Sequence, residues 1–152
     1  MNKEHLIKDG KFYNPETAEL IAVSTWYVNY EVKRNKIYKS AKGVFFSVIE
    51  IAETGHEKAP AYPYPFVVLK DGSKVNHGQV LLGEHSINPK NGGFRDDVKI
   101  KDVMISSELS EDEVKRTMES IMKGVQFSFS TYSTSKYALM KTYAELFEIE
   151  EA

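Results

Sequence analysis

Residues 36–51 carry the clearest structural signal in this chain, and they read Lys36-Ile37-Tyr38-Lys39-Ser40-Ala41-Lys42-Gly43-Val44-Phe45-Phe46-Ser47-Val48-Ile49-Glu50-Ile51. Gly43 can supply the positive φ that a tight reversal needs, so the run predicts a β-hairpin that turns at Lys42-Gly43. Residues 44–51 are apolar at odd and even positions alike. This pattern is typical of a strand that lies in the centre of a sheet and is covered on both faces.

Further strands are predicted on both sides of this hairpin. Asn14-Pro15-Glu16-Thr17 has the composition of a capped turn, and residues 18–28 after it are rich in Val, Ile, Thr, Trp and Tyr. Residues 66–70 and 98–106 give two more strand patterns.

Two helices are expected towards the C-terminus. Ser110-Glu111-Asp112-Glu113 is a capping box, and the apolar stripe after it (Val114, Met118, Ile121, Met122) ends at Gly124. A second helical pattern starts at about Ser135. We therefore predict an α+β fold, an antiparallel sheet of four to six strands with two C-terminal helices packed on it. One domain is expected over 1–152, with 54–100 as a variable insertion and 148–152 as an acidic tail.

The composition excludes several kinds of chemistry. Cysteine is absent from the 152 residues, which removes disulfides, thiolate nucleophiles and zinc or iron–sulfur sites built on cysteine. No apolar run approaches the length of a membrane span, and the first residues lack the apolar core of a signal peptide. A cytoplasmic location is the resulting expectation. The formal net charge of −2 is too close to neutral to imply nucleic-acid binding by itself, and nucleic acid is not the expected partner.

No motif in the chain indicates catalysis, a metal or a cofactor. The four histidines, His5, His56, His77 and His85, include no pair at the i, i+4 spacing of helical metal ligands. A Gly-x-Ser-x-Gly nucleophile elbow is also missing from the sequence. We therefore expect no enzymatic activity, no metal and no cofactor. The sequence does not fix the oligomeric state, and a homodimer is one arrangement that it allows.

The segment Pro60-Ala61-Tyr62-Pro63-Tyr64-Pro65-Phe66 is a candidate contact region for a partner protein. Its prolines favour an extended backbone that is already ordered before binding. Tyr62, Tyr64 and Phe66 would present large side chains of low conformational entropy, as interface anchors do. The other interpretation, in which these aromatic side chains fold back over the sheet as a lid, is slightly favoured, because exposed aromatic side chains are uncommon without a partner.

Basic residues between 33 and 42 form a second candidate region, for which two interpretations are open. A solvated sheet edge, protected from aggregation by its lysines, is favoured because no aromatic residues alternate with the charges as in single-strand binders. In the alternative, Lys36, Lys39 and Lys42 bind the phosphates of a ligand, together with Arg95 beside Gly92-Gly93.

The chain resembles a group of small uncharacterised proteins of phages and mobile elements of Gram-positive bacteria. The resemblance lies in Tyr13-Asn14 with Thr17-Ala18-Glu19-Leu20-Ile21, in Ile37-Tyr38-Lys39-Ser40 with Gly43-Val44-Phe45-Phe46, and in the segments 105–113 and 143–151. Residues 54–100 depart from the pattern of the group, whose motifs are structural.

This resemblance implies no shared enzymatic function. Phage accessory proteins of this size often inhibit host defence, and anti-CRISPR proteins are among them. The resulting expectation is a non-enzymatic phage- or prophage-encoded binding protein that occludes a host defence protein such as a CRISPR effector. The alternative is a protein that binds a small ligand or nucleotide, for example a sponge for a defence signalling nucleotide.

Overall fold

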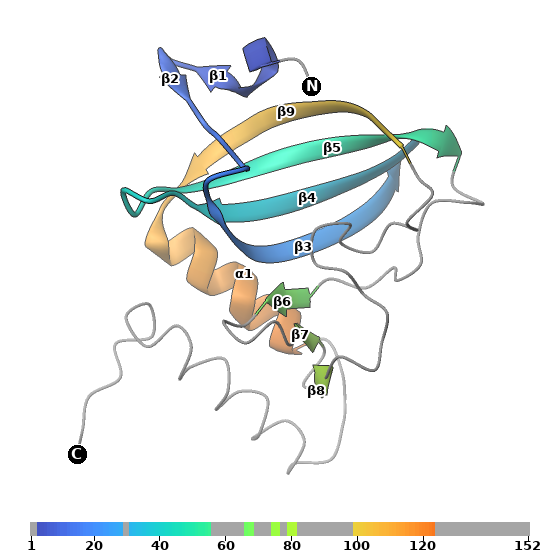
Figure 1. Cartoon of the computed structure of the whole chain (residues 1–152). Helices are drawn as coiled ribbons and strands as arrows, with labels where there is room; N and C mark the ends of the chain where they lie inside the picture. The colour runs from blue at the N-terminus through green and yellow to red at the C-terminus, as the bar shows by residue number, and fades with distance from the viewer. Residues whose placement is uncertain are drawn as a thin grey trace. The chain divides into compact units, whose positions relative to one another are not determined.

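The computed structural model describes residues 3–28, 31–55, 66–68, 74–76, 79–81 and 99–123 (Figure 1). The chain divides into two compact units. Residues 1–65 and 87–109 form the first unit, and residues 66–86 and 110–152 form the second. The candidate site lies in the first unit.

The first unit contains four long antiparallel strands in the order β3-β4-β5-β9. They are β3 (Glu19–Val28), β4 (Glu31–Lys39), β5 (Phe45–Gly55) and β9 (Ile100–Leu109). The predicted hairpin is β4–β5, and Gly43 takes a φ of +87° at its turn. The prediction of this hairpin is therefore confirmed.

Strand β5 is covered on both faces, as its apolar pattern predicts. It pairs with β4 on one side and β9 on the other, and the consecutive residues Phe45, Phe46, Ser47 and Val48 are all buried. Neighbouring side chains on a strand point to opposite faces, so a run of four buried residues requires cover on both.

Register places a polar and an apolar cluster on the same face of the sheet. Tyr38 lies opposite Phe46 and Lys36 opposite Val48, while Arg34 lies opposite Glu50. The apolar end of this face is a core in which Phe46 and Tyr38 stack at 5.5 Å between ring centroids. The core has five buried residues, which are Leu6, Tyr13, Tyr38, Phe46 and Val48.

The N-terminal residues fold onto this unit as a small hairpin. A 3₁₀ turn, η1 (Lys3–Leu6), leads into β1 (Ile7–Lys8), which pairs with β2 (Lys11–Phe12) across an Asp9-Gly10 turn. Leu6 is fully buried in the core, and η1 contacts β9 (Figure 1). Asn14 then caps the following turn, because its side-chain oxygen accepts the backbone N–H of Glu16 at 3.0 Å.

The second unit contains three short strands and one described helix. Strand β7 (Lys74–Asn76) pairs antiparallel with β6 (Phe66–Val68) and with β8 (Gln79–Leu81). Helix α1 (Glu111–Lys123) contacts β6 and β7 and buries Val114, Met118 and Ile121. Its capping box is formed: Ser110 Oγ accepts the N–H of Glu113, and Glu113 Oε1 accepts that of Ser110, each at 3.2 Å.

The α+β class and the antiparallel sheet agree with the prediction. The expected second helix, from about Ser135, lies outside the described residues, as does the acidic tail at 148–152. The β1–β2 hairpin was not predicted, because strands of two residues leave no periodicity to detect. Its one local signal is Asp9-Gly10, a dipeptide typical of tight hairpin turns.

Candidate functional site

The structure places the predicted contact residues in different environments. Phe66 belongs to β6 and is only 1% exposed, so its side chain is not available at the surface as a partner anchor. Tyr62, Tyr64 and Arg95 lie outside the described residues. Lys39 is partly buried, with its Nζ 5.6 Å from the centroid of the Phe45 ring. Lys42 is exposed at the β4–β5 turn.

The interpretation of the basic residues as a solvated sheet edge is wrong for two of them. Strand β4 lies between β3 and β5, and Arg34 and Lys36 are 3% and 4% exposed. Lys36 is thus also a poor candidate for binding the phosphates of a ligand. One of its partners is Glu50, whose Oε1 lies 3.0 Å from Lys36 Nζ.

Glu50 balances part of this buried positive charge. Its carboxylate accepts Arg34 Nε at 2.6 Å and a second Arg34 nitrogen at 3.3 Å, a bidentate pairing. Burial lowers the pKa of Lys36; the charge of Glu50 opposes this shift and that of Arg34 adds to it. Burial, together with the negative charge of Glu50, raises the pKa of Tyr38 on the same face. The charged groups of Arg34, Lys36 and Glu50 therefore interact with one another inside the first unit.

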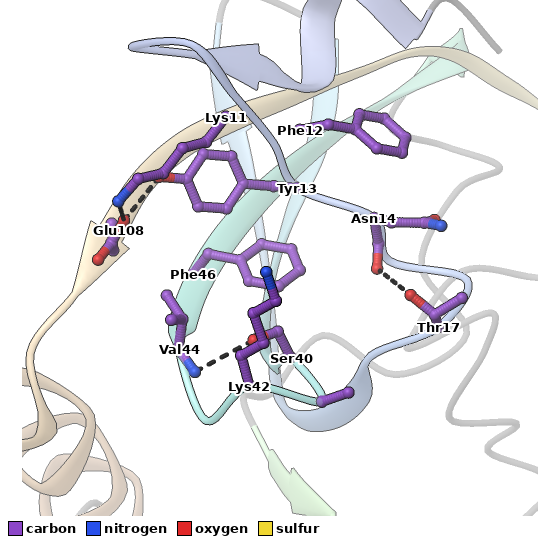
Figure 2. Close-up of a pocket in the computed structure, with 11 residues that line it drawn as sticks. Lys11, Phe12, Tyr13, Asn14, Thr17, Ser40, Lys42, Val44, Phe46 and Glu108 are labelled. Atoms are coloured by element: carbon purple, nitrogen blue, oxygen red, sulfur yellow. Dashed lines mark hydrogen bonds and ion pairs between the residues drawn. The ribbon is translucent and has the colours of Figure 1, made fainter.

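A pocket of about 480 Å³ lies beside the β4–β5 turn in the first unit (Figure 2). Residues 11–14 and Thr17 form one side, residues 40–42 and Val44 the other, and Phe46 and Glu108 complete the lining. Its volume lies within the range of small-molecule sites. Several of its polar groups come from turns, and the core residues Tyr13 and Phe46 form part of its lining.

Hydrogen bonds fix the turn that carries Lys42. Ser40 N–H donates to Val44 O at 2.8 Å and Gly43 N–H donates to Ser40 O at 2.9 Å, while Ser40 Oγ accepts Val44 N–H at 3.1 Å. Figure 2 shows the Lys42 side chain extending from this turn towards the ring of Phe46. No ion pair with Lys42 forms within the described part of the chain.

The opposite wall of the pocket carries the carboxylate of Glu108, which already accepts a hydrogen bond from within the chain. Tyr13 donates its hydroxyl to Glu108 Oε2 at 2.6 Å, and Lys11 Nζ lies 3.7 Å from the same oxygen (Figure 2). The hydrogen bond from Tyr13 lowers the pKa of Glu108, and the same bond raises the pKa of Tyr13 to about 12. Glu108 is therefore negatively charged and Tyr13 neutral over the physiological range.

The rim of the pocket continues into an exposed apolar pair. Ile7 and Phe12 are cross-strand neighbours in the β1–β2 hairpin and are 50% and 48% exposed. They are the large hydrophobic side chains that the described residues leave exposed. Sequence reasoning missed them because a single apolar residue on each side of a turn has no periodic pattern.

Polar contacts fasten this hairpin to β9. Lys8 Nζ donates to Ser106 O at 3.1 Å, and His5 Nδ1 lies 2.9 Å from Asp102 Oδ1. The contact with His5 lowers the pKa of Asp102. With the Tyr13–Glu108 bond, these contacts attach the residues on both sides of the exposed pair to β9.

Among the described residues, no group of three His, Cys, Asp or Glu side chains could hold a metal ion. No described helix is long and apolar enough to span a membrane. His56, His77 and His85 lie outside the described residues. Comparison with protein-family models, curated proteins and solved structures finds no match to this chain.

Proposed function

We propose that this chain is a non-enzymatic binding protein that acts by contact with another protein. The observation that carries this proposal is the Ile7–Phe12 pair, two large apolar side chains left about half exposed next to each other. Apolar and aromatic side chains at the centre of an interface contribute most of its binding energy.

The rigidity of the hairpin supports this role. Its turn uses positive φ angles at Asp9 (52°) and Gly10 (77°), and its contacts with β9 hold it to the sheet. Because the hairpin is already ordered, it loses little further conformational entropy when a partner buries Ile7 and Phe12. This low cost favours affinity. Tyr62 and Tyr64, which lie outside the described residues, remain further candidate contacts.

The resemblance to phage and mobile-element proteins suggests the class of partner. On this basis we propose a phage or prophage origin, action in the host cytoplasm, and occlusion of a host defence protein such as a CRISPR effector. Occlusion requires a surface that fits the target and needs no reacting groups. The one carboxylate in the pocket, Glu108, is already bonded to Tyr13, which is consistent with binding in place of catalysis.

The test is DNA cleavage by a purified CRISPR effector of a Gram-positive bacterium, measured with increasing amounts of this protein. We expect the Ile7→Ser/Phe12→Ser variant to need at least about tenfold more protein for the same inhibition, since a tenfold change corresponds to about 1.4 kcal/mol. The matched control is Ile7→Val/Phe12→Tyr, which keeps apolar contact area and should inhibit like the wild type.

Two results would each contradict one part of the proposal, the contact surface or the target. Equal inhibition by the serine and control variants would exclude the hairpin as the contact surface. Cleavage that is the same with and without the protein would exclude this effector as the target. Capture of binding proteins from lysate of a Gram-positive host, with the same two variants compared, would then test the hairpin independently of that target.

A second candidate function, binding of a small ligand or nucleotide, is favoured by the pocket itself. Lys42 from the alternative set of ligand-binding residues lines it, and Lys11, which sequence reasoning did not select, lies on its other side.

A further inference from the structure

We propose that the pocket binds a small ligand made of a planar ring and a single anionic group, either a carboxylate or a phosphate monoester. This inference rests on the second candidate function and names its ligand class. It is independent of protein contact through Ile7, which does not line the pocket.

Lys42 is the group that would bind the anion. Its side chain extends over the pocket towards the Phe46 ring (Figure 2), and the bonds of Ser40 with Gly43 and Val44 fix its backbone. Gly43 has a φ of +87°, which fixes the turn in a conformation that most other residues avoid. A lysine on a rigid turn loses little backbone entropy when it binds a ligand, and its ammonium group offers three donors to oxygen atoms.

Aromatic residues supply a surface for the ring of the ligand. Tyr13 and Phe46 pack against each other at 5.3 Å between centroids and line the interior of the pocket, where both are largely buried. Phe12 also lines the pocket but remains 48% exposed, so its ring is accessible from solvent. A planar ligand can stack on this ring, as bases do on aromatic side chains in nucleotide-binding proteins.

The charges of the pocket limit how much negative charge a ligand can carry. Lys11 and Lys42 are positive, but Glu108 lies 3.7 Å from Lys11 and offsets that charge. One cation, Lys42, is left for the ligand among the residues that line the pocket. A second or third phosphate would meet the carboxylate of Glu108, so a polyphosphate is expected to bind more weakly than a monophosphate.

The experiment is an NMR titration of the ¹⁵N-labelled full chain at low salt. AMP supplies a planar ring with a phosphate monoester, and indole-3-carboxylate supplies a planar ring with a carboxylate. Adenosine, inorganic phosphate and ATP serve as comparison ligands. We expect AMP or indole-3-carboxylate to shift the amide signals of residues 40–44, and each comparison ligand to bind at least about fivefold more weakly than the better of the two. Which of the two binds more tightly identifies the source of the anion.

Variants separate the roles of the residues. Lys42→Ala should weaken binding of the better ligand at least about tenfold, whereas Lys101→Ala, the loss of an exposed lysine elsewhere on the first unit, should change it less than twofold. Phe12→Ala should weaken the aromatic ligands but leave inorganic phosphate unchanged. Ile7→Ser should bind the ligand like the wild type while losing protein contact, so the two proposals can fail separately.

Three results would overturn the inference. They are equal loss of binding in Lys42→Ala and Lys101→Ala, inorganic phosphate or ATP binding as tightly as the better aromatic ligand, or unchanged signals of residues 40–44 with every ligand. A circular dichroism spectrum of Lys42→Ala that matches the wild type ensures that weaker binding reports the lost ammonium group and not unfolding.

Discussion

Glu50 compensates two buried positive charges, and the hydrophobic pattern of the sheet does not predict that these charges are buried. Its carboxylate contacts both Arg34 and Lys36 inside the first unit. Removal of one member of a buried ion pair is costly when it leaves the other charge without a compensating partner, whereas replacement of the whole pair by apolar side chains of similar volume is often neutral. The roles of these three residues are therefore unequal.

We predict that Glu50→Gln destabilises the fold by about 3 kcal/mol or more, because two buried cations lose the negative charge that both contact. Lys36→Met should change the free energy of unfolding by less than about 1 kcal/mol, since the bidentate Arg34–Glu50 pair remains. Urea denaturation of both variants measures the difference. Equal destabilisation by the two substitutions would show that Glu50 has no special role.

Tyr13 gives a prediction for alkaline pH. Its pKa is about 12 in the folded chain against 10.0 for the ordinary side chain, mainly because it donates to Glu108. The folded state thus holds the phenol proton more tightly, and this stabilisation is complete below pH 10 and lost as the pH rises to about 12.

We therefore expect the unfolding free energy of the wild type to fall more steeply between pH 10 and 12 than that of Tyr13→Phe, which keeps the ring but has no proton to lose. Comparison of the two proteins is needed because Tyr38 also has a raised pKa and titrates in both. Parallel curves would mean that the Tyr13–Glu108 bond does not stabilise the folded chain. On the acid side, the lowered pKa of Glu108 adds stability that is lost as the pH falls below its ordinary value of 4.5.

Helix α1 shows how a local sequence signal determines an element boundary. Ser110 and Glu113 exchange the two hydrogen bonds of the capping box. We predict that Ser110→Ala lowers the unfolding free energy by about 1 kcal/mol, the usual cost of a lost N-cap. Ser120→Ala makes the same chemical change at an exposed position inside the helix and should be neutral or slightly stabilising, since alanine favours helix.

Circular dichroism in urea would measure both variants, and a cost for Ser120→Ala equal to that for Ser110→Ala would exclude the cap as the cause.

Elements with strong local or periodic signals could be predicted from the sequence. The hairpin around Gly43, the covered strand at 44–51 and the start of α1 are confirmed. The pocket could not be predicted, because it combines Lys11 and Lys42 with Glu108, residues that only the register of the sheet and the N-terminal hairpin bring together. Arg34 and Lys36 were misjudged for the same reason: charge suggests an exposed edge, and only the position of β4 inside the strand order shows their burial.

The whole molecule carries little net charge, and its exposed apolar pair makes this important for solubility. The formal net charge is −2 and the pI of the sequence is about 6.1. Proteins near zero net charge associate more readily because electrostatic repulsion no longer keeps the molecules apart. We predict that light scattering of concentrated solutions is greatest near pH 6 and that Ile7→Ser reduces it there, whereas Ile7→Val does not. Equal scattering by the two variants would show that association uses another surface.

Residues 5–13 are bonded to β9, so this unit can be completed only after β9 has been synthesised. His5, Lys8 and Tyr13 bond to partners 97, 98 and 95 positions later in the chain. Leu6 and Tyr13 therefore leave the ribosome long before the strand that covers them exists, and until then both remain exposed to water and to chaperones. Contacts this distant in sequence also slow folding. Residues 5–13 can therefore take their native contacts only after β9 has been made.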